Sequence, residues 1–132
     1  MRLVGHPPTP EQQEIQGYRA GGFTISGREF HGSVAVFADR VEAWAVTDAA
    51  SLEIHDLTPF RDCEPPLDLL LLGLGERFAL PDPEVLRALS TWRLPYELMS
   101  TAAACRTFNL LLSEGRRVAA ALIALPRGGD RS

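Results

Sequence analysis

The sequence contains no lysine, so every one of its thirteen basic residues is an arginine. This absence excludes a Schiff-base lysine as a nucleophile, and it excludes the lysine of a Walker-type phosphate loop. Two cysteines and three histidines are present, and their positions give neither a C-x-x-C pair nor the spacing of zinc ligands. We therefore expect neither a metal site nor a bound cofactor.

The sequence also lacks long apolar runs. None approaches the roughly 20 residues that a helix needs to cross a bilayer, and the first residues lack the apolar centre of a signal peptide. We therefore expect a cytoplasmic protein that does not insert directly into a membrane. The formal net charge of −4 argues against binding to nucleic acid, because such a protein needs a basic surface that releases phosphate counterions.

A chain of 132 residues is long enough for one domain with its own hydrophobic core. Residues 1–14 are polar and carry Pro7, Pro8 and Pro10, which is typical of a flexible tail. Residues 127–132 form a second polar stretch after Pro126. We therefore predict a single α/β domain over residues 15–126 between two flexible tails.

The N-terminal half is rich in short β-like segments. Phe23–Ile25 predicts one strand, and Ser33–Phe37 and Val41–Val46 predict two more that a three-residue loop joins into a hairpin. A short helix is expected near Asp56–Asp62. The stretch Phe60–Pro66 is predicted to be an exposed loop, which would make its aromatic residue a candidate for contact with a partner.

The C-terminal half alternates between strand and helix. The five predicted segments are Leu67–Leu72, Asp82–Trp92, Leu94–Met99, Ser100–Glu114 and Arg117–Leu125. The first and last are almost entirely apolar, as expected of strands that are buried on both faces. This order predicts an α/β fold with a parallel or mixed sheet, to which the first half adds a hairpin or a small extra sheet.

A ligand site is predicted where two of these strands end. If Leu67–Leu72 and Leu94–Met99 are parallel, their carboxyl ends lie at one edge of the sheet, where open α/β sheets bind ligands. The candidate residues for an anion or a small molecule are Gly73, Gly75, Ser100, Thr101 and Arg106. The alternative is structural, because the glycines would also serve a sharp turn and the alanines after Thr101 would also serve close packing.

The helix that follows carries two further candidates. Cys105 shares a face with Phe108 and Leu112, which predicts a buried structural thiol rather than a reactive one. A polar stripe is expected on another face, as a solvated surface, as a docking surface or as a cap on carbonyl groups at the sheet edge: Arg106, Asn109, Ser113 and Arg117. No set of residues forms a catalytic constellation, so we assign no catalytic residue. The sequence favours a non-enzymatic protein and leaves enzymatic activity open.

Two long segments, LLLLGLGERF and LPYELMSTAAACRTFNLLLSEGRRVAAALIAL, resemble a small single-domain family of unknown function. Its human relatives include a mitochondrial complex I assembly factor and an adipogenesis-associated protein. The shared features are Gly73 and Gly75, then Glu97, Met99 and Thr101, then residues 104–109 and the turn at 114–118. The similarity covers roughly residues 15–126. Leu74 departs from the pattern, because many relatives carry Thr or Ser there.

The resemblance implies a three-layer α/β fold, with a central mixed sheet flanked by helices and a small extra β-hairpin layer. It implies no established catalytic residues and no established cofactor. The leading hypothesis is therefore a non-enzymatic protein–protein interaction protein, with an unidentified partner, that assists assembly of respiratory membrane complexes. The alternative is a small-molecule or anion-binding domain, or an enzyme, that uses the Gly73–Gly75 loop and the helix start at Thr101. The oligomeric state stays open.

Overall fold

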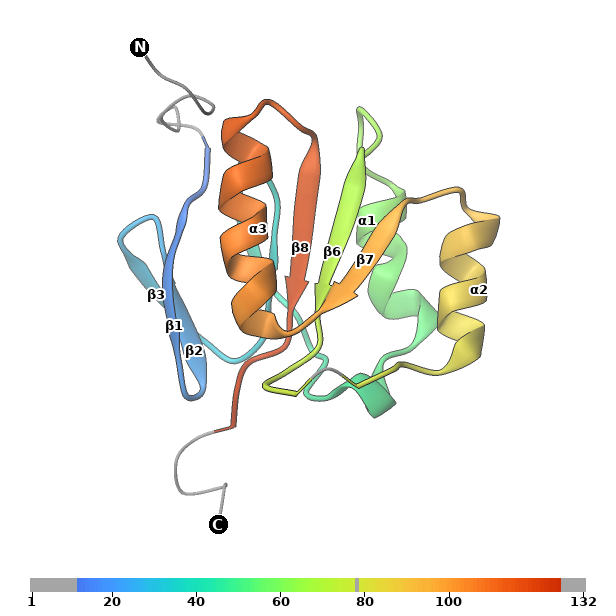
Figure 1. Ribbon diagram of the computed structural model, residues 1–132, viewed down its shortest axis with the longest axis horizontal. Helices are drawn as coiled ribbons and strands as arrows, with labels where there is room; N and C mark the ends of the chain where they lie inside the picture. The colour runs from blue at the N-terminus through green and yellow to red at the C-terminus, as the bar shows by residue number, and fades with distance from the viewer. Residues whose placement is uncertain (1–11, 78, 127–132) are drawn as a thin grey trace.

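The computed structural model of the protein describes residues 12–77 and 79–126, and Figure 1 shows their arrangement. A five-stranded sheet forms the centre. One helix covers one of its faces, two helices cover the other, and a three-stranded sheet lies beside the single helix. This confirms the predicted three-layer α/β architecture. Residues 1–11 and 127–132, which make up most of the two predicted tails, lie outside the described residues, so the tails stay a prediction.

The smaller sheet is an antiparallel meander of β1 (Ile15–Arg19), β2 (Gly22–Ile25) and β3 (Arg28–His31). β2 confirms the strand that was predicted from its apolar residues. β3 was not predicted, because three of its four side chains are exposed and leave no apolar pattern. The predicted extra layer of the N-terminal half is therefore a three-stranded sheet rather than a single hairpin.

The larger sheet has the strand order β5-β4-β8-β6-β7. Its strands are β4 (Val34–Val36), β5 (Val41–Ala43), β6 (Leu69–Gly73), β7 (Tyr96–Met99) and β8 (Val118–Leu122). β8 is antiparallel to β4 and parallel to β6, and β7 is parallel to β6. The sheet is therefore mixed, the predicted hairpin β4–β5 forms part of it, and the last strand is central as expected.

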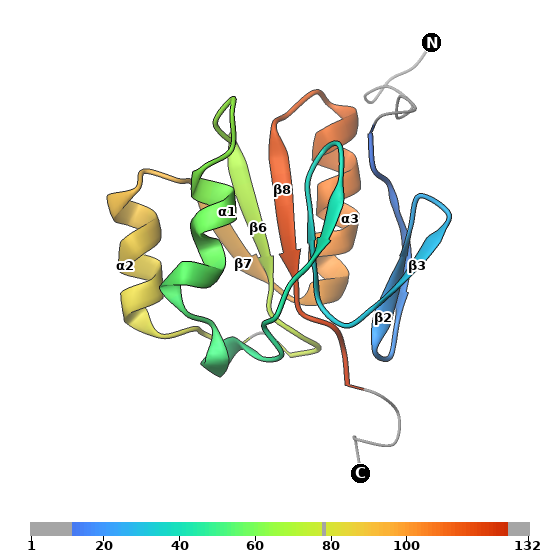
Figure 2. The same ribbon diagram turned by 180° about the vertical axis from the view of Figure 1, so that it is seen from behind.

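Three α-helices connect these strands: α1 (Thr58–Arg61), α2 (Pro83–Thr91) and α3 (Thr101–Ser113). Two short 3-10 helices, at Ala49–Ser51 and Ile54–Leu57, precede α1. The connections through α2 and α3 run in opposite directions across the sheet, so right-handed crossovers place these helices on opposite faces (Figures 1 and 2). No helix within residues 12–77 and 79–126 has the length and apolar character that a membrane crossing requires.

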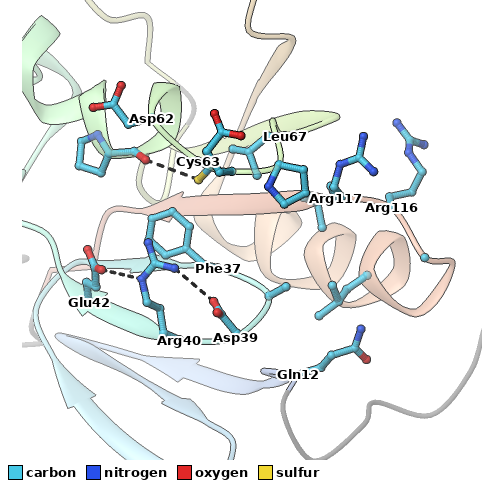
Figure 3. A pocket seen from close by; sticks show the side chains of 17 residues that line it. Gln12, Phe37, Asp39, Arg40, Glu42, Asp62, Cys63, Leu67, Arg116 and Arg117 are labelled. Atoms are coloured by element: carbon cyan, nitrogen blue, oxygen red, sulfur yellow. Dashed lines mark hydrogen bonds and ion pairs between the residues drawn. The ribbon is translucent and has the colours of Figure 1, made fainter.

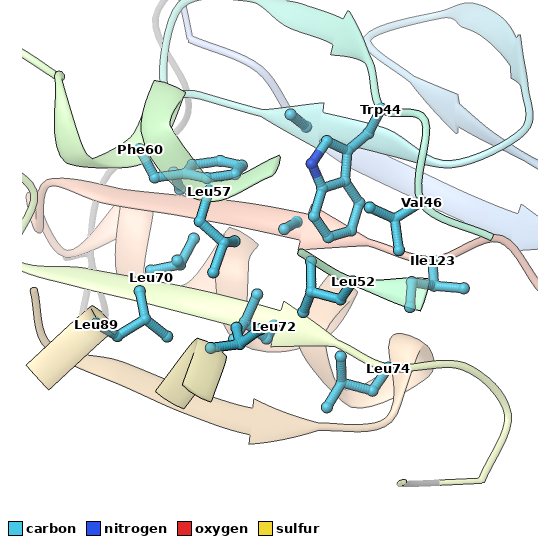
Figure 4. Packing of buried hydrophobic residues seen from close by; sticks show 14 of the residues in the cluster. Trp44, Val46, Leu52, Leu57, Phe60, Leu70, Leu72, Leu74, Leu89 and Ile123 are labelled. Atoms are coloured by element: carbon cyan, nitrogen blue, oxygen red, sulfur yellow. The ribbon is translucent and has the colours of Figure 1, made fainter. Parts of the chain in front are cut away.

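Two hydrophobic cores form, one on each face of the five-stranded sheet. Successive strand residues point to opposite faces, so Leu70 and Leu72 pack toward α1 and α2 (Figure 4), whereas Leu71 packs toward α3. Most of the other large side chains of the first core come from the segments before β6. Both faces of the sheet are therefore covered, whereas its outer strands β5 and β7 keep exposed or half-buried side chains.

The prediction of a surface aromatic in Phe60–Pro66 is wrong, because Phe60 is only 1% exposed. Its ring stacks on that of Phe37 at a centroid distance of 5.2 Å and meets the edge of Trp44 at 6.3 Å. The cause is local, since Leu57 and Phe60 lie three residues apart across the start of α1 and therefore share one face. The short helix turns the ring into the core and leaves its charged neighbours outside.

Candidate functional site

The carboxyl ends of β6 and β7 lie side by side, as the sequence predicts. The two strands pair in parallel from Leu70 opposite Tyr96 to Gly73 opposite Met99. Beyond them, the Thr101 amide donates a hydrogen bond of 2.9 Å to the Gly75 carbonyl. The Gly75 amide in turn donates one of 2.9 Å to the Thr101 hydroxyl. The loop after β6 and the start of α3 are therefore joined directly.

The buried Thr101 side chain links the loop after β6 to the end of β8. Its side chain is 0% exposed, and its hydroxyl donates a 2.7 Å hydrogen bond to the Ile123 carbonyl just after β8. The neighbouring Ser100 acts as the N-cap of α3, because its hydroxyl oxygen accepts a 3.2 Å hydrogen bond from the Ala103 amide. Both hydroxyl groups of the predicted ligand site are thus engaged inside the chain.

Two different structural constraints favour glycine at positions 73 and 75. A Cβ atom added to Gly73 would lie 3.0 Å from the Thr101 Cα and 3.0 Å from the Leu122 Cδ2, so a larger residue fits between β8 and α3 only if its neighbours move. Gly75 has a φ of +100°, in the left-handed region that favours glycine. Arg106, the last predicted member of the site, is exposed on the second turn of α3.

The predicted polar stripe along α3 is not one continuous free surface. Asn109 holds β1 against the helix: its Oδ1 accepts a 2.9 Å bond from the Ile15 amide, and its Nδ2 donates a 2.7 Å bond to the Ile15 carbonyl. The Ser113 hydroxyl donates to the Leu110 carbonyl at 2.7 Å. Arg117, beyond the helix, pairs with Asp68 at 3.5 Å. On the outer side, Arg106 is exposed and Leu110 is 48% exposed.

A cleft of about 620 Å³ opens at the other end of the sheet, where β6 and β8 begin (Figure 3). Three segments that are distant in the sequence form most of its wall: the turn at 38–40 after β4, the loop at 62–67 before β6, and the turn at 115–117 before β8. The sequence analysis did not predict this cleft. No single segment carries a signal for it, since it exists only because the fold brings these turns together.

The cleft has a mixed charge and one cation–aromatic contact. The Arg40 guanidinium lies 4.0 Å from the centre of the Phe37 ring. It also bonds Glu42 at 2.7 Å and Asp39 at 3.2 Å, and these contacts raise the pKa of Arg40. On the opposite wall, the Arg117 Nε donates a 2.8 Å hydrogen bond to the Pro66 carbonyl. The arrangement suits a polar ligand with an apolar part better than a simple ion.

Neither cysteine has the properties of an activated nucleophile. Cys63 lines the cleft, where its Sγ donates to the Pro59 carbonyl at 3.5 Å and burial raises the pKa of the thiol. Cys105 lies in the core on the inner face of α3, as predicted, and burial raises its pKa to about 12. A thiol with a raised pKa stays protonated and weakly nucleophilic at neutral pH.

Within the described part of the chain, no group of three or more His, Cys, Asp or Glu side chains could hold a metal ion. In the same part of the chain, every buried side-chain nitrogen or oxygen atom has a hydrogen-bond partner.

The model of a family described as protein of unknown function (DUF498/DUF598) matches residues 15–123. NADH dehydrogenase (ubiquinone) 1 alpha subcomplex assembly factor 3 of Danio rerio is 37% identical over 114 residues, which are 86% of this chain. The protein of the same name from Xenopus tropicalis is 35% identical over 109 residues, which are 83% of this chain. The chain spans 66% and 60% of the length of these two relatives.

Among solved structures, the solution structure of a Mth938-like domain from Bordetella pertussis is similar over almost the whole chain. The two are 29% identical, with a TM-score of 0.74 over 96% of this chain and 94% of that one. The two sheets and three α-helices of the described residues therefore have a Mth938-like fold.

Proposed function

The chain belongs to the family of proteins of unknown function DUF498/DUF598, and on this premise we propose that it is a non-enzymatic interaction protein that assists assembly of a respiratory membrane complex. The observation that carries the proposal is the similarity to two relatives named as assembly factors of NADH dehydrogenase, at 35–37% identity over more than four fifths of this chain. Both relatives are longer, so their role is transferred here as a proposal.

The chemistry of the described residues agrees with a role that does not require a reaction. Both thiols have raised pKa values, and the hydroxyl groups of Ser100 and Thr101 are held by intrachain hydrogen bonds. The outer side of α3 instead presents Arg106 beside the exposed Leu110. The stripe of Arg106, Asn109, Ser113 and Arg117 stays a prediction as an interaction surface, and Arg106→Glu is its most direct test.

A deletion strain tests the assembly role. We expect the respiratory NADH dehydrogenase complex to fall in native gels and in membrane activity, while a second respiratory complex stays at its normal level as the internal control. The wild-type gene should restore the level, and affinity capture should recover subunits of the same complex. An unchanged level in the deletion strain would contradict the proposal. The cytoplasmic location is also still a prediction, which cell fractionation would test.

The alternative function, a small-molecule or anion-binding domain, has the support of one observation. The cleft of about 620 Å³ lies within the size range of ligand pockets, roughly 300–1,000 Å³. At the predicted site of Gly73, Gly75, Ser100, Thr101 and Arg106, a ligand would depend on backbone amides and Arg106, because both hydroxyls are engaged. A metabolite stability screen tests this function. If a compound stabilises the wild-type protein but not Arg40→Ala, the result would place the ligand in the cleft. If it fails to stabilise Arg106→Ala instead, the result would place the ligand at the predicted site.

A further inference from the structure

β7 forms one outer edge of the five-stranded sheet, and part of its backbone is unpaired. The Leu70 amide donates to the Pro95 carbonyl and the Leu74 amide donates to the Met99 carbonyl, each at 2.9 Å. The backbone groups of successive strand residues point alternately to the two sides. Tyr96 and Leu98 therefore direct their N–H and C=O groups away from β6. Within the described residues, no hydrogen bond reaches these four groups.

The other sheet edges are more strongly protected than β7. β5 has three residues, and its central Glu42 is tied to Arg40. β3 exposes Arg28, Glu29 and His31, and β1 is fastened to α3 through Asn109. Short strands and exposed charges are the usual means by which proteins prevent edge pairing. β7 carries a single charge, Glu97, among half-buried apolar side chains.

A shallow groove of about 350 Å³ lies beside β7 on the side of α2. Tyr96 of the strand and Leu89 of α2 line it, together with Leu94. When a peptide adds to a sheet edge, backbone hydrogen bonds supply affinity, and pockets for alternate side chains supply specificity. β7 offers free backbone groups at Tyr96 and Leu98, and the groove lies beside its first residue, Tyr96.

The charge of Glu97 decides which segment fits. A second copy of this chain fits poorly, since a two-fold antiparallel pairing that uses all four free groups places Tyr96 opposite Leu98 of the second copy. Glu97 then faces Glu97 of the second copy in a close pair, and like charges directly opposite are destabilising. A strand with a cation at that position converts the same contact into an attraction.

We propose that the β7 edge binds an extended segment of a partner protein, with Arg or Lys opposite Glu97 and apolar residues on either side of this cation. The cation lies on the face of the sheet that Glu97 occupies. The two apolar side chains lie on the opposite face, one beside Tyr96 and the groove and the other beside Leu98. The inference deepens the proposed function, on which it rests, by naming the chemistry of the partner segment.

The test uses the folded protein and a blocked peptide, Thr-Thr-Val-Arg-Val-Thr-Thr, followed by nuclear magnetic resonance. We expect shifted resonances at residues 96–98 and slower hydrogen exchange of the Tyr96 and Leu98 amides. The matched peptide with Glu in place of Arg should bind about threefold to tenfold more weakly. In Glu97→Arg this preference should reverse. No response in β7, an equal affinity for both peptides, or concentration-dependent dimerisation through β7 would overturn the inference.

A second variant removes one backbone donor. Leu98→Pro lacks the outward N–H group and keeps the bonds to β6, because those are made by residues 95, 97 and 99. We expect it to lose binding of the arginine peptide, whereas Leu98→Val keeps the donor and keeps binding. Retained binding by a folded Leu98→Pro would contradict the inference. If Leu98→Pro does not fold, the Glu97→Arg variant still tests the inference.

The two proposals fail in different ways. If the peptide does not bind but deletion of the gene lowers the respiratory complex, the β7 inference is wrong and the assembly role stands. If the peptide binds with the expected charge preference but deletion leaves the complex unchanged, β7 is a binding edge and the assembly role is wrong.

Discussion

The two ends of the parallel strands differ in how their polar groups are used. At the carboxyl end, the Thr101 side chain bonds both Gly75 and Ile123 and is fully buried. At the amino end, the turns around Arg40, Cys63 and Arg117 leave a cleft of about 620 Å³. Glycines and hydroxyls at the end of a strand are therefore compatible with closure of the sheet as well as with ligand binding. The hydrogen-bond partners of each hydroxyl and backbone amide distinguish closure of the sheet from ligand binding.

The largest effect is expected for Thr101→Val. Valine has nearly the same shape but cannot bond the Gly75 amide or the Ile123 carbonyl, so both groups are left unsatisfied in the interior. We expect a loss of about 2 to 4 kcal/mol in the free energy of unfolding, measured in urea. Thr101→Ser keeps the hydroxyl and should lose much less. Equal losses in the two variants would show that packing rather than hydrogen bonding closes this end.

A smaller loss is expected for Gly73→Ala. The added methyl group would lie 3.0 Å from the backbone of Thr101 and 3.1 Å from the Ala104 Cβ, so the neighbouring atoms must move apart. Overpacking of this kind costs about 1 to 3 kcal/mol. Gly17→Ala is the control, because a Cβ there meets nothing within 4 Å. If both variants unfold at the same urea concentration, the close approach at Gly73 is not limiting.

We expect the stability of the protein to depend on pH through the buried Cys105. The pKa of Cys105 is raised by burial from 9.0 to about 12, so the folded state holds the proton that the unfolded state releases. The resulting stabilisation is complete below about pH 9 and is lost as the pH rises toward 12. The unfolding free energy should therefore fall by roughly 1.4 kcal/mol per pH unit in this range. In Cys105→Ala this part of the slope should vanish, as urea unfolding at several pH values would show.

The smallest effect is expected at the open end, for Arg117→Ala. The Arg117 side chain is 55% exposed, and its ion pair with Asp68 is long, at 3.5 Å. Exposed pairs contribute about 0 to 1 kcal/mol, so the urea midpoint should move little. A loss as large as that of Thr101→Val would mean that the two ends are equally closed, and the comparison would fail.

The sequence predicted most of the fold in its second half. The apolar runs that became β6 and β8, and the capping residues Asp82 and Ser100, act locally and remain visible without the tertiary structure. The exposed strand β3 carries no such pattern. The position of Phe60 was mistaken because its charged neighbours suggested a surface loop, although its spacing from Leu57 indicated a shared helical face.

For the candidate site, the sequence could predict that Gly75 and Thr101 lie close together. It could not predict that the Thr101 hydroxyl is engaged in hydrogen bonds within the chain. Parallel strands had to bring Gly75 next to Thr101, and they do. The third partner of that network, Ile123, comes from the end of β8 and depends on the strand order. The cleft depends on that order as well, because turns 38–40, 62–67 and 115–117 meet only when β8 lies between β4 and β6.

The central position of β8 has a consequence during synthesis on the ribosome. β4 and β6 pair with β8 on its two sides and not with each other, so the hairpin and the β6–β7 unit stay separate until residues 118–122 emerge. Until then the inner edges of β4 and β6 are both open, and such edges attract other chains. The inner edges of β4 and β6 are therefore covered only when β8 takes its place between them.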